Sequence, residues 1–174
     1  MSSSFGTLYR ITTFGESHGP GVGVVIDGCP SGFAVSLNAV QHELTRRRPG
    51  QSSLTTPRNE SDELEILSGL YEGKTIGSPI SILIRNTDIK SGDYKQWSDI
   101  FRPSHADYTY NAKYKHRTPL GGGRASVREA IGRVAAGAIA RQFLKETLGM
   151  ESIAWVESVG DVHVNHFERP PESR

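Results

Sequence analysis

Two glycine-rich segments carry residues suited to proton transfer and to anion binding. The first, Gly15-Glu-Ser-His-Gly19, matches the Gly-x-Ser-x-Gly pattern of hydrolases, which places its serine where a strand runs into a helix. Here Pro20, Gly21 and Gly23 follow, and glycine and proline at this density do not begin a helix. A turn between two strands explains the glycines better than a hydrolase elbow does. It does not explain the Glu-Ser-His sequence between them.

The second segment, Gly121-Gly-Gly-Arg124, precedes a predicted helix that carries Arg128 in its first turn. A helix N-terminus offers unpaired N–H groups and a positive dipole end, and glycines let an anion come close to the backbone. The segment therefore predicts an anion site, with a flexible loop as the alternative. It is not a Walker loop, because the Gly-Lys-Ser/Thr ending is absent.

A run of three arginines, Arg46-Arg47-Arg48, precedes Pro49-Gly50. It is compatible with a solvated helix end, which the helix dipole favours, and with a clamp on phosphate or carboxylate groups, which suits the bidentate geometry of arginine. A nucleic-acid contact is the weakest interpretation, because no aromatic residues interleave with the arginines. Among the six histidines, His18 and His105 are the two embedded in unusual local sequence, the latter in Arg102-Pro-Ser-His-Ala-Asp-Tyr108.

Alternating apolar and β-branched residues predict the strands that must position these groups. We expect strands at 8–14, 22–27, 65–70, 80–85 and 152–159. Ser36 is a candidate N-cap for a helix with Leu37, Val40 and Leu44 on one face, and that helix should end at Pro49. A short helix should follow His105, while 51–62 and 91–103 are expected to be irregular.

The strongest helix signal begins at Ser126, which forms a Ser-x-x-Glu capping box with Glu129. Val127, Ile131, Val134 and Ala138 follow on one apolar face, and Glu129 and Arg133 are spaced as an i,i+4 ion pair. Gly149 is the expected C-cap. Gly132 and the alanines around it make the helix thin, so another element could approach closely.

Composition excludes several classes of protein. The chain has 174 residues, a length typical of one domain, and its only cysteine, Cys29, excludes an intrachain disulfide and a Cys-rich zinc site. It has no apolar run of about 20 residues for a membrane span and no signal-like N-terminus. The net charge is only +1, yet 100–149 holds nine Lys/Arg against three Asp/Glu. That local excess favours a small anionic ligand over nucleic acid, and we expect a cytoplasmic protein without a bound metal.

Taken together, the motifs resemble those of chorismate synthases. The matching segments occur in the family's order and cover nearly all of 5–147: Tyr9-Arg-Ile-Thr-Thr-Phe-Gly-Glu-Ser-His-Gly19, Val25-Ile-Asp-Gly28 with Pro30, Arg46-Arg-Arg-Pro-Gly-Gln51, Ile66-Leu-Ser-Gly69, Gly73-Lys-Thr-Ile-Gly-Ser-Pro-Ile80, Arg102-Pro-Ser-His-Ala-Asp-Tyr-Thr109, and Gly121-Gly-Gly-Arg-Ala-Ser-Val-Arg-Glu129 with Arg133-Val-Ala-Ala-Gly137.

The resemblance implies a reaction. Family members convert 5-enolpyruvylshikimate 3-phosphate to chorismate and phosphate by an anti 1,4-elimination, the last step of the shikimate pathway. They use reduced FMN without net redox change, and NADPH enters as a candidate reductant of that flavin. The resemblance also implies an α+β fold, a β-α-β sandwich with helices between antiparallel sheets, and a homotetramer. Family chains are about twice as long, so residues 1–174 are expected to be the N-terminal part of a single domain.

The resemblance assigns roles to individual residues. His18 matches the histidine that gives a proton to the departing phosphate, and His105 matches the one that protonates the reduced flavin. Arg124, Ala125 and Ser126 match the flavin-binding stretch. Substrate or phosphate contacts are expected from four residues, namely Ser17, Arg47, Arg48 and Arg128.

Some positions depart from the family pattern. Ser53 stands where Arg or Lys is usual, Lys115 where Gly is usual, and Ala125 where Ser is common, while Val127 and Ala130 replace common Ala and Thr. The missing second half supplies further flavin contacts in the family, so the 174-residue chain alone is expected to be inactive. The alternative hypothesis is a non-catalytic fragment that binds FMN or another anion.

Overall fold

The computed structural model describes residues 3–50, 60–87 and 99–164, and its centre is one antiparallel sheet. Five strands lie in the order β1-β2-β3-β7-β4, and every neighbouring pair is antiparallel. They are β1 (Ser4–Phe5), β2 (Arg10–Gly15), β3 (Gly21–Asp27), β7 (Ile80–Arg85) and β4 (Leu64–Ser68). Two hairpins are separate from this sheet, β5 (Leu70–Tyr71) with β6 (Lys74–Thr75) and β8 (Ser158–Val159) with β9 (Val162–His163).

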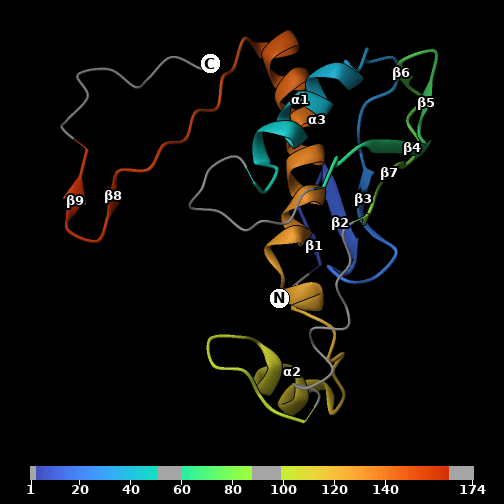
Figure 1. Ribbon diagram of the computed structural model, residues 1–174. Helices are drawn as coiled ribbons and strands as arrows, with labels where there is room; N and C mark the ends of the chain where they lie inside the picture. Colours follow the sequence, from blue (N-terminus) through green and yellow to red (C-terminus); the bar gives the residue numbers. More distant parts are fainter. Residues whose placement is uncertain (1–2, 51–59, 88–98, 165–174) are drawn as a thin grey trace.

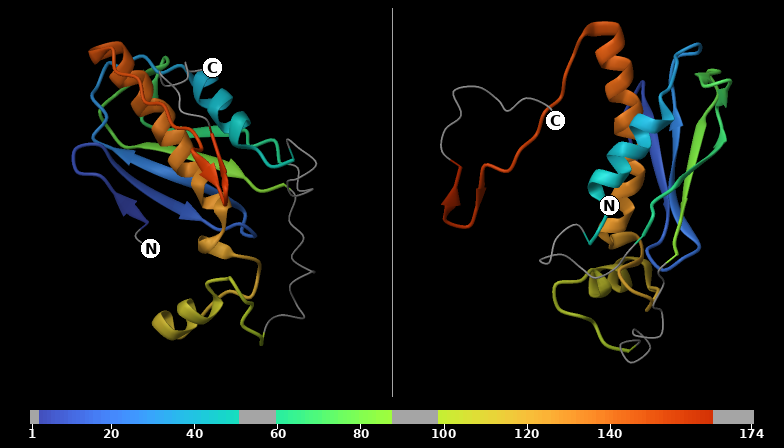
Figure 2. Two further views of the ribbon diagram at one scale, coloured as in Figure 1. Left: turned by 90° about the vertical axis from the view of Figure 1, so that its left-hand side faces the viewer. Right: turned by 45° about the horizontal axis from the view of Figure 1, so that its top comes forward.

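Two helices cover one face of the sheet, α1 (Leu37–Arg47) and α3 (Ala130–Leu148), as Figure 1 shows. A third helix, α2 (Asp107–Tyr114), lies beyond the sheet, near the start of α3 (Figure 1). The layered arrangement of sheet and helices is clearest in the right-hand view of Figure 2. The predicted α+β class with antiparallel sheets is confirmed, and the described residues contain one sheet of the expected sandwich with its helices.

Alternation along the strands builds the core between sheet and helices. Val22, Val24 and Ile26 on β3 and Ile80, Ile82 and Ile84 on β7 are all at most 1% exposed, since every second side chain of a strand points to the same face. The helices contribute Val40 and Leu44 from α1 and Ile131, Ala135 and Ile139 from α3. This core fixes the sheet against α3, so residues at the ends of both elements have defined relative positions.

Gly132 lets α3 approach β3 closely, as the small residues of this helix predicted. A Cβ atom at Gly132 would stand 2.8 Å from the carbonyl oxygen of Gly23, nearer than real Cβ contacts come. The phenol of Tyr9 donates a hydrogen bond to the Ala136 carbonyl at 2.8 Å and ties the start of β2 to the same helix. Burial of this phenol raises the pKa of Tyr9.

The two main helices begin differently from each other. Ser36 Oγ accepts a hydrogen bond from the Ala39 N–H at 3.3 Å, which confirms the predicted N-cap of α1. The capping box at Ser126 is wrong in detail, because Ser126 Oγ accepts from the Arg128 N–H within a 3-10 turn at Val127–Glu129, and α3 begins only at Ala130. Val127 is 82% exposed and does not belong to the buried face.

Most predicted boundaries hold within about two residues, with one clear failure. The expected strand at 152–159 is wrong, since only Ser158–Val159 is a strand, in the β8–β9 hairpin that extends away from the helices (Figure 1). Gly149 has φ +64° and caps α3 as predicted. The expected strand at 65–70 is interrupted at Gly69, where φ is +88°. The expected irregular segments 51–62 and 91–103 lie largely outside the described residues.

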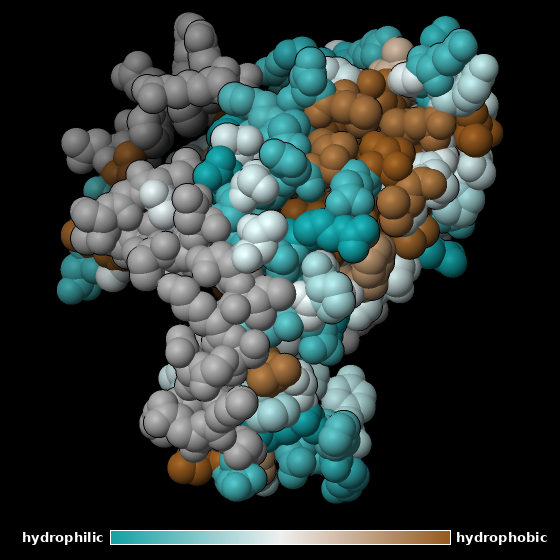
Figure 3. Space-filling view, turned by 45° about the vertical axis from the view of Figure 1, so that its right-hand side comes forward, coloured by the Kyte–Doolittle hydropathy of each residue, from teal (hydrophilic) through white to brown (hydrophobic). Residues whose placement is uncertain are grey.

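The sheet face opposite the helices carries an apolar surface. Figure 3 shows apolar side chains gathered on the side of the molecule formed by the sheet and the β5–β6 hairpin. Leu67 on β4, Tyr71 on β5 and Ile76 just after β6 are each more than half exposed. In the part of the chain that the structure describes, none of the helices combines the length and apolar character that a bilayer span requires.

Candidate functional site

The turn between β2 and β3 presents His18 at one end of the sheet. The Gly19 N–H donates to the Glu16 carbonyl at 3.1 Å, so Ser17 and His18 are the central residues of a β-turn. Ser17 is 1% exposed, and its Oγ lies 3.0 Å from His18 Nδ1. Because strand β3 rather than a helix follows, the Gly-x-Ser-x-Gly segment is not a nucleophile elbow, in agreement with the turn predicted from its glycines.

The segment Gly121–Arg124 packs directly on this turn. The Ser17 N–H donates to the Gly123 carbonyl at 3.3 Å. Gly121 has φ +60°, and a Cβ atom there would stand 2.1 Å from His18 Nδ1. Glycine at position 121 is therefore required both by the backbone conformation and by the imidazole beside it. The structure thus brings together the two glycine-rich segments that the sequence pointed to separately.

Arg124 fastens the glycine segment to β2. Its guanidinium donates to the Gly15 carbonyl at 3.0 Å and to the Thr13 hydroxyl at 2.8 Å, and it lies 3.5 Å from the Glu129 carboxylate. The Thr13 hydroxyl in turn donates to Glu129 at 2.5 Å. Glu129 also pairs with Arg133 at 3.2 Å, as its i,i+4 spacing predicted. Burial opposes ionisation of Glu129, but the hydrogen bonds from Thr13 and Arg133 outweigh it and lower its pKa.

The other two residues of the predicted flavin-binding stretch are near the start of α3. Ala125 ends a 3-10 turn at Gly123–Ala125, and Ser126 starts the next one. Both are half-buried, while the Arg124 side chain is directed to the sheet. Glycine backbone and nearby cations give this loop the chemistry that an anionic group needs, while the Arg124 guanidinium is engaged by β2 and Glu129.

His105 is exposed, and it is joined to the same loop through Arg102. Its Nδ1 lies 3.0 Å from the Pro103 carbonyl oxygen, just before α2. The Arg102 guanidinium makes two hydrogen bonds of 2.8 Å to the Asp107 carboxylate and one of 2.7 Å to the Gly121 carbonyl. The side-chain hydrogen bond from Arg102 outweighs the effect of burial and lowers the pKa of Asp107 to about 2. One guanidinium therefore connects the His105 segment to the glycine that contacts His18.

A buried ion cluster lies behind the turn and contains two of the predicted anion-binding arginines. Asp62 accepts from Arg128 at 2.9 Å on one oxygen and from Arg47 at 3.2 Å on the other. Arg128 also lies 3.7 Å from Glu60, and the side chains of Glu60 and Asp62 are fully buried. In this structure the guanidiniums of Arg128 and Arg47 are thus paired with internal carboxylates. Arg48 is half-buried and is the C-cap residue of α1.

Asn86, which sequence reasoning did not single out, joins this cluster to the turn. Its side-chain NH2 donates to the carbonyls of Glu16 at 2.8 Å and Gly19 at 2.7 Å, while its Oδ1 accepts from Arg128 Nε. Asn86 directly follows β7, and a polar residue after a buried strand was the only local signal. Glu60, Asp62 and Asn86 are all far from the turn in sequence, so spacing could not associate them with His18.

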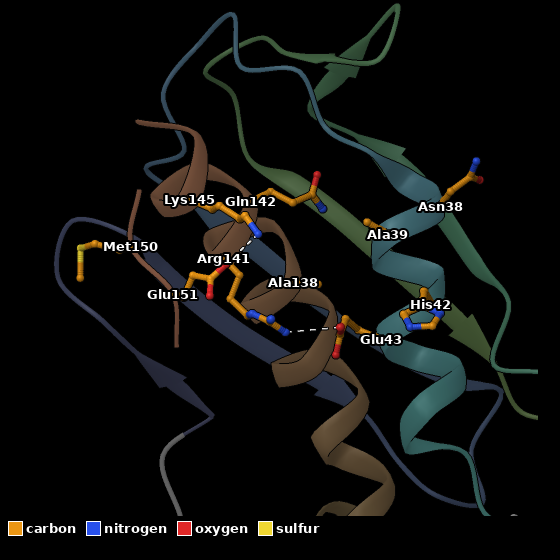
Figure 4. A pocket seen from close by; sticks show the side chains of 10 residues that line it. All are labelled: Asn38, Ala39, His42, Glu43, Ala138, Arg141, Gln142, Lys145, Met150 and Glu151. Carbon is orange, nitrogen blue, oxygen red and sulfur yellow. Dashed lines mark hydrogen bonds and ion pairs between the residues drawn. The ribbon is translucent and has the colours of Figure 1, made fainter. Parts of the chain in front are cut away.

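A groove between α1 and α3 is distinct from this site (Figure 4). Its cations are paired across or beside it, Arg141 with Glu43 at 3.3 Å and Lys145 with Glu151 at 2.7 Å. The side chains that line it do not include any of the predicted site residues. Within the described ranges, no group of three or more His, Cys, Asp or Glu side chains is placed to hold a metal ion.

Comparisons with known proteins agree on one family. The family model for chorismate synthase matches residues 9–173. Curated chorismate synthases of Thermosynechococcus vestitus, Synechocystis and Prochlorococcus marinus (strain MIT 9312) are 60%, 59% and 57% identical, each over 93% of this chain. A solved structure described as a crystal structure of chorismate synthase superposes with a TM-score of 0.59 at 36% identity, covering 80% of this chain and 35% of its own. The chain spans 44–45% of the length of those curated relatives, and it belongs to the chorismate synthase family.

Proposed function

We propose that this chain supplies the His18 side of a chorismate synthase active site, in a longer protein that eliminates phosphate from 5-enolpyruvylshikimate 3-phosphate to give chorismate. The observation that carries this proposal is the position of His18, which Ser17 and Gly121 hold at the end of the sheet beside a loop anchored by Arg102 and Arg124. An imidazole in such a setting can donate a proton to a departing phosphate oxygen. Anionic groups bound beside it would favour its charged form.

The basic residues divide into two groups by exposure. Arg47 and Arg48 keep part of their side chains exposed at the end of α1, so we assign them direct contact with substrate anions. Arg128 and Ser17 are at most 5% exposed, so they would support the site from behind, Arg128 through Asp62 and Ser17 through His18. Arginine suits the direct role, because its planar fork matches carboxylate and phosphate geometry.

Reduced FMN is the cofactor we propose, and when bound it supplies electron density to the substrate and recovers it, with NADPH as a candidate reductant. The 125–126 stretch and the backbone around Gly122 fit the anionic parts of such a group, because glycine lets an anion come close to backbone N–H groups. Arg124 would act by holding this stretch on β2. His105, exposed and next to the same loop, would deliver the proton that balances the reduced flavin's negative charge.

The test is phosphate release from the substrate by the full-length protein, with and without reduced FMN. We expect turnover only with reduced FMN, and a large loss in His18→Ala and in His105→Ala. His42→Ala, which changes an exposed histidine on α1, is the matched control and should retain turnover. Normal turnover in both site variants would contradict the assigned roles.

A second candidate function applies to the 174-residue chain alone, which we propose to be an inactive FMN- or anion-binding fragment. It carries the anchored glycine loop and most of the basic residues but less than half the length of its relatives. Titration with reduced FMN should show binding without turnover, and the absence of any binding would reject this candidate.

We further propose that residues 1–174 form the N-terminal part of a single domain, that the full-length protein is a homotetramer, and that it is cytoplasmic. Association is supported by the apolar surface at Leu67, Tyr71 and Ile76, since exposed apolar patches commonly mark protein interfaces (Figure 3). A reducing compartment suits a buried, unpaired Cys29. Light scattering of the full-length protein tests the oligomeric state directly.

A further inference from the structure

Asn86 makes three hydrogen bonds to the turn that carries His18 and to the residue after it, and a fourth to Arg128. Its NH2 group donates to the carbonyls of Glu16 and Gly19, and its backbone N–H donates to the Pro20 carbonyl at 3.1 Å. Its Oδ1 accepts from the guanidinium of Arg128. The two carbonyls lie on either side of Ser17 and His18 in the chain, so one side chain holds both ends of the turn.

The partners of Asn86 also fix the orientation of its amide. A side-chain amide has one acceptor oxygen and one donor NH2 group. The cationic Arg128 can only donate and the two turn carbonyls can only accept, so a flipped amide would face repulsion on both sides. Arg128 is itself held by Asp62 at 2.9 Å and Glu60 at 3.7 Å. The buried ion cluster therefore provides a fixed base from which Asn86 holds the turn.

We propose that Asn86 is a positioning residue for His18, acting through the turn rather than on the substrate. The inference rests on the proposed function, in which the His18 imidazole donates a proton. Gly121 packs closely on the imidazole, so a small movement of the turn would also move the ring against that glycine. Displacement of a reacting group by about 1 Å can reduce catalysis about 100-fold.

The first test compares Asn86→Asp with Asn38→Asp in the full-length protein, where Asn38 is an exposed residue of α1. Asn86→Asp keeps an acceptor for Arg128 but turns oxygen toward both carbonyls of the turn. We expect kcat to fall about 100-fold with KM changed less than about threefold, because geometry at the reacting centre is lost while ground-state binding remains. Asn38→Asp should match the wild type. An Asn86→Asp variant with wild-type kcat overturns the proposal, because the hydrogen bonds from Asn86 to the two turn carbonyls would then not be needed for turnover.

The second test observes His18 without relying on turnover. In full-length protein labelled with nitrogen-15 histidine, the His18 signals are assigned by their absence in His18→Gln. Asn86→Ala adds no charge, so a changed tautomer ratio of the His18 ring in this variant would come from a displaced turn and not from a new charge near the ring. We expect that change in Asn86→Ala and not in Asn38→Ala. An unchanged ring spectrum overturns the positioning role, even if turnover falls.

The two tests separate failure of this inference from failure of the proposed function. If the wild-type protein releases no phosphate, the proposed function fails, while the His18 spectrum still decides whether Asn86 positions the ring. If the wild type turns over and both Asn86 variants resemble it, only the positioning role is lost.

Discussion

Arg128 and Asp62 form an ion pair of 2.9 Å in which the guanidinium is 4% exposed and the carboxylate is fully buried. The second oxygen of Asp62 accepts from Arg47, so this carboxylate joins two of the arginines that the sequence marked as anion-binding. A buried charge is costly unless it is paired, so removing one charged member of this cluster would leave another buried charge without its partner. Asn86 links the cluster by hydrogen bonds to the turn that carries His18.

Removing the charge of Asp62 should therefore be strongly destabilising. Asp62 has φ +51°, a conformation that asparagine also tolerates, so Asp62→Asn changes the charge with little backbone cost. Leaving a buried arginine without its main partner costs about 3 kcal/mol or more, which denaturant unfolding of the full-length protein can measure. Glu43→Gln is the control, since its pairs with Arg46 and Arg141 are partly exposed and should be worth less than about 1 kcal/mol. Equal losses of unfolding free energy in Asp62→Asn and Glu43→Gln would contradict the prediction that the buried cluster contributes more to stability than the exposed pairs.

Gly121→Ala should displace the His18 ring. The new Cβ would meet Nδ1 at 2.1 Å, so the imidazole must move, and we expect turnover to fall about 100-fold. Gly160→Ala is a matched control, because Gly160 has a similar φ of +57° but no atom within 4 Å of the added Cβ. Both substitutions strain the backbone, and only Gly121→Ala should affect phosphate release. Retained activity in Gly121→Ala would show that the ring does not depend on this contact.

The Arg102–Asp107 pair predicts a stability change in acid. Its carboxyl has a folded pKa of about 2, held below the usual value of 3.8 mainly by the hydrogen bond from Arg102. Because the pKa of Asp107 is lower in the folded than in the unfolded state, its ionised form stabilises the protein at pH values above the unfolded pKa. This contribution is lost as the pH falls from about 4 toward 2. Unfolding free energies measured across that window should decrease less steeply in Asp107→Asn than in the wild type. Parallel curves for the two proteins would rule out the pair as a source of the acid sensitivity.

Lys115→Gly should stabilise the end of α2. Lys115 caps this helix with φ +61°, the left-handed conformation that glycine adopts without cost, and it is also where the family usually has glycine. We expect a gain of about 0.5–1 kcal/mol in unfolding free energy. Lys113→Gly removes the same side chain inside the helix and should instead destabilise by about 1 kcal/mol. Shifts of the same sign in both variants would contradict this explanation.

Local patterns in the sequence predicted most of the elements and several site residues. The alternation at 22–27 and 80–85 was confirmed because one face of each strand is buried against α3. The positions of His18 and Gly121 were predicted as separate motifs, and their contact follows from a fold that the motifs alone do not specify. Ser53 lies outside the described residues, so the effect of that departure stays a prediction.

The errors and the missed residues both depend on contacts, present or absent, between segments that lie far apart in the sequence. Ser126 and Glu129 have the spacing of a capping box, but Thr13, far along the chain, takes the Glu129 carboxylate and leaves the first turn as a 3-10 turn. The residues 152–159 alternate like a strand, yet the described structure gives most of them no neighbouring strand, and a strand exists only through its pairing. Glu60, Asp62 and Asn86 were missed because their contacts are with residues 27 to 70 positions away.

The close contact between α3 and β3 at Gly132 also limits which amino acids position 132 can accept. The atom that a Cβ would meet is the Gly23 carbonyl oxygen, part of the backbone, so no substitution at position 23 can make room. Gly137, in the same helix, has nothing within 4 Å of an added Cβ and should accept many residues. In a library that randomises both positions and selects for growth, sequences at 132 would converge on glycine while those at 137 would stay varied.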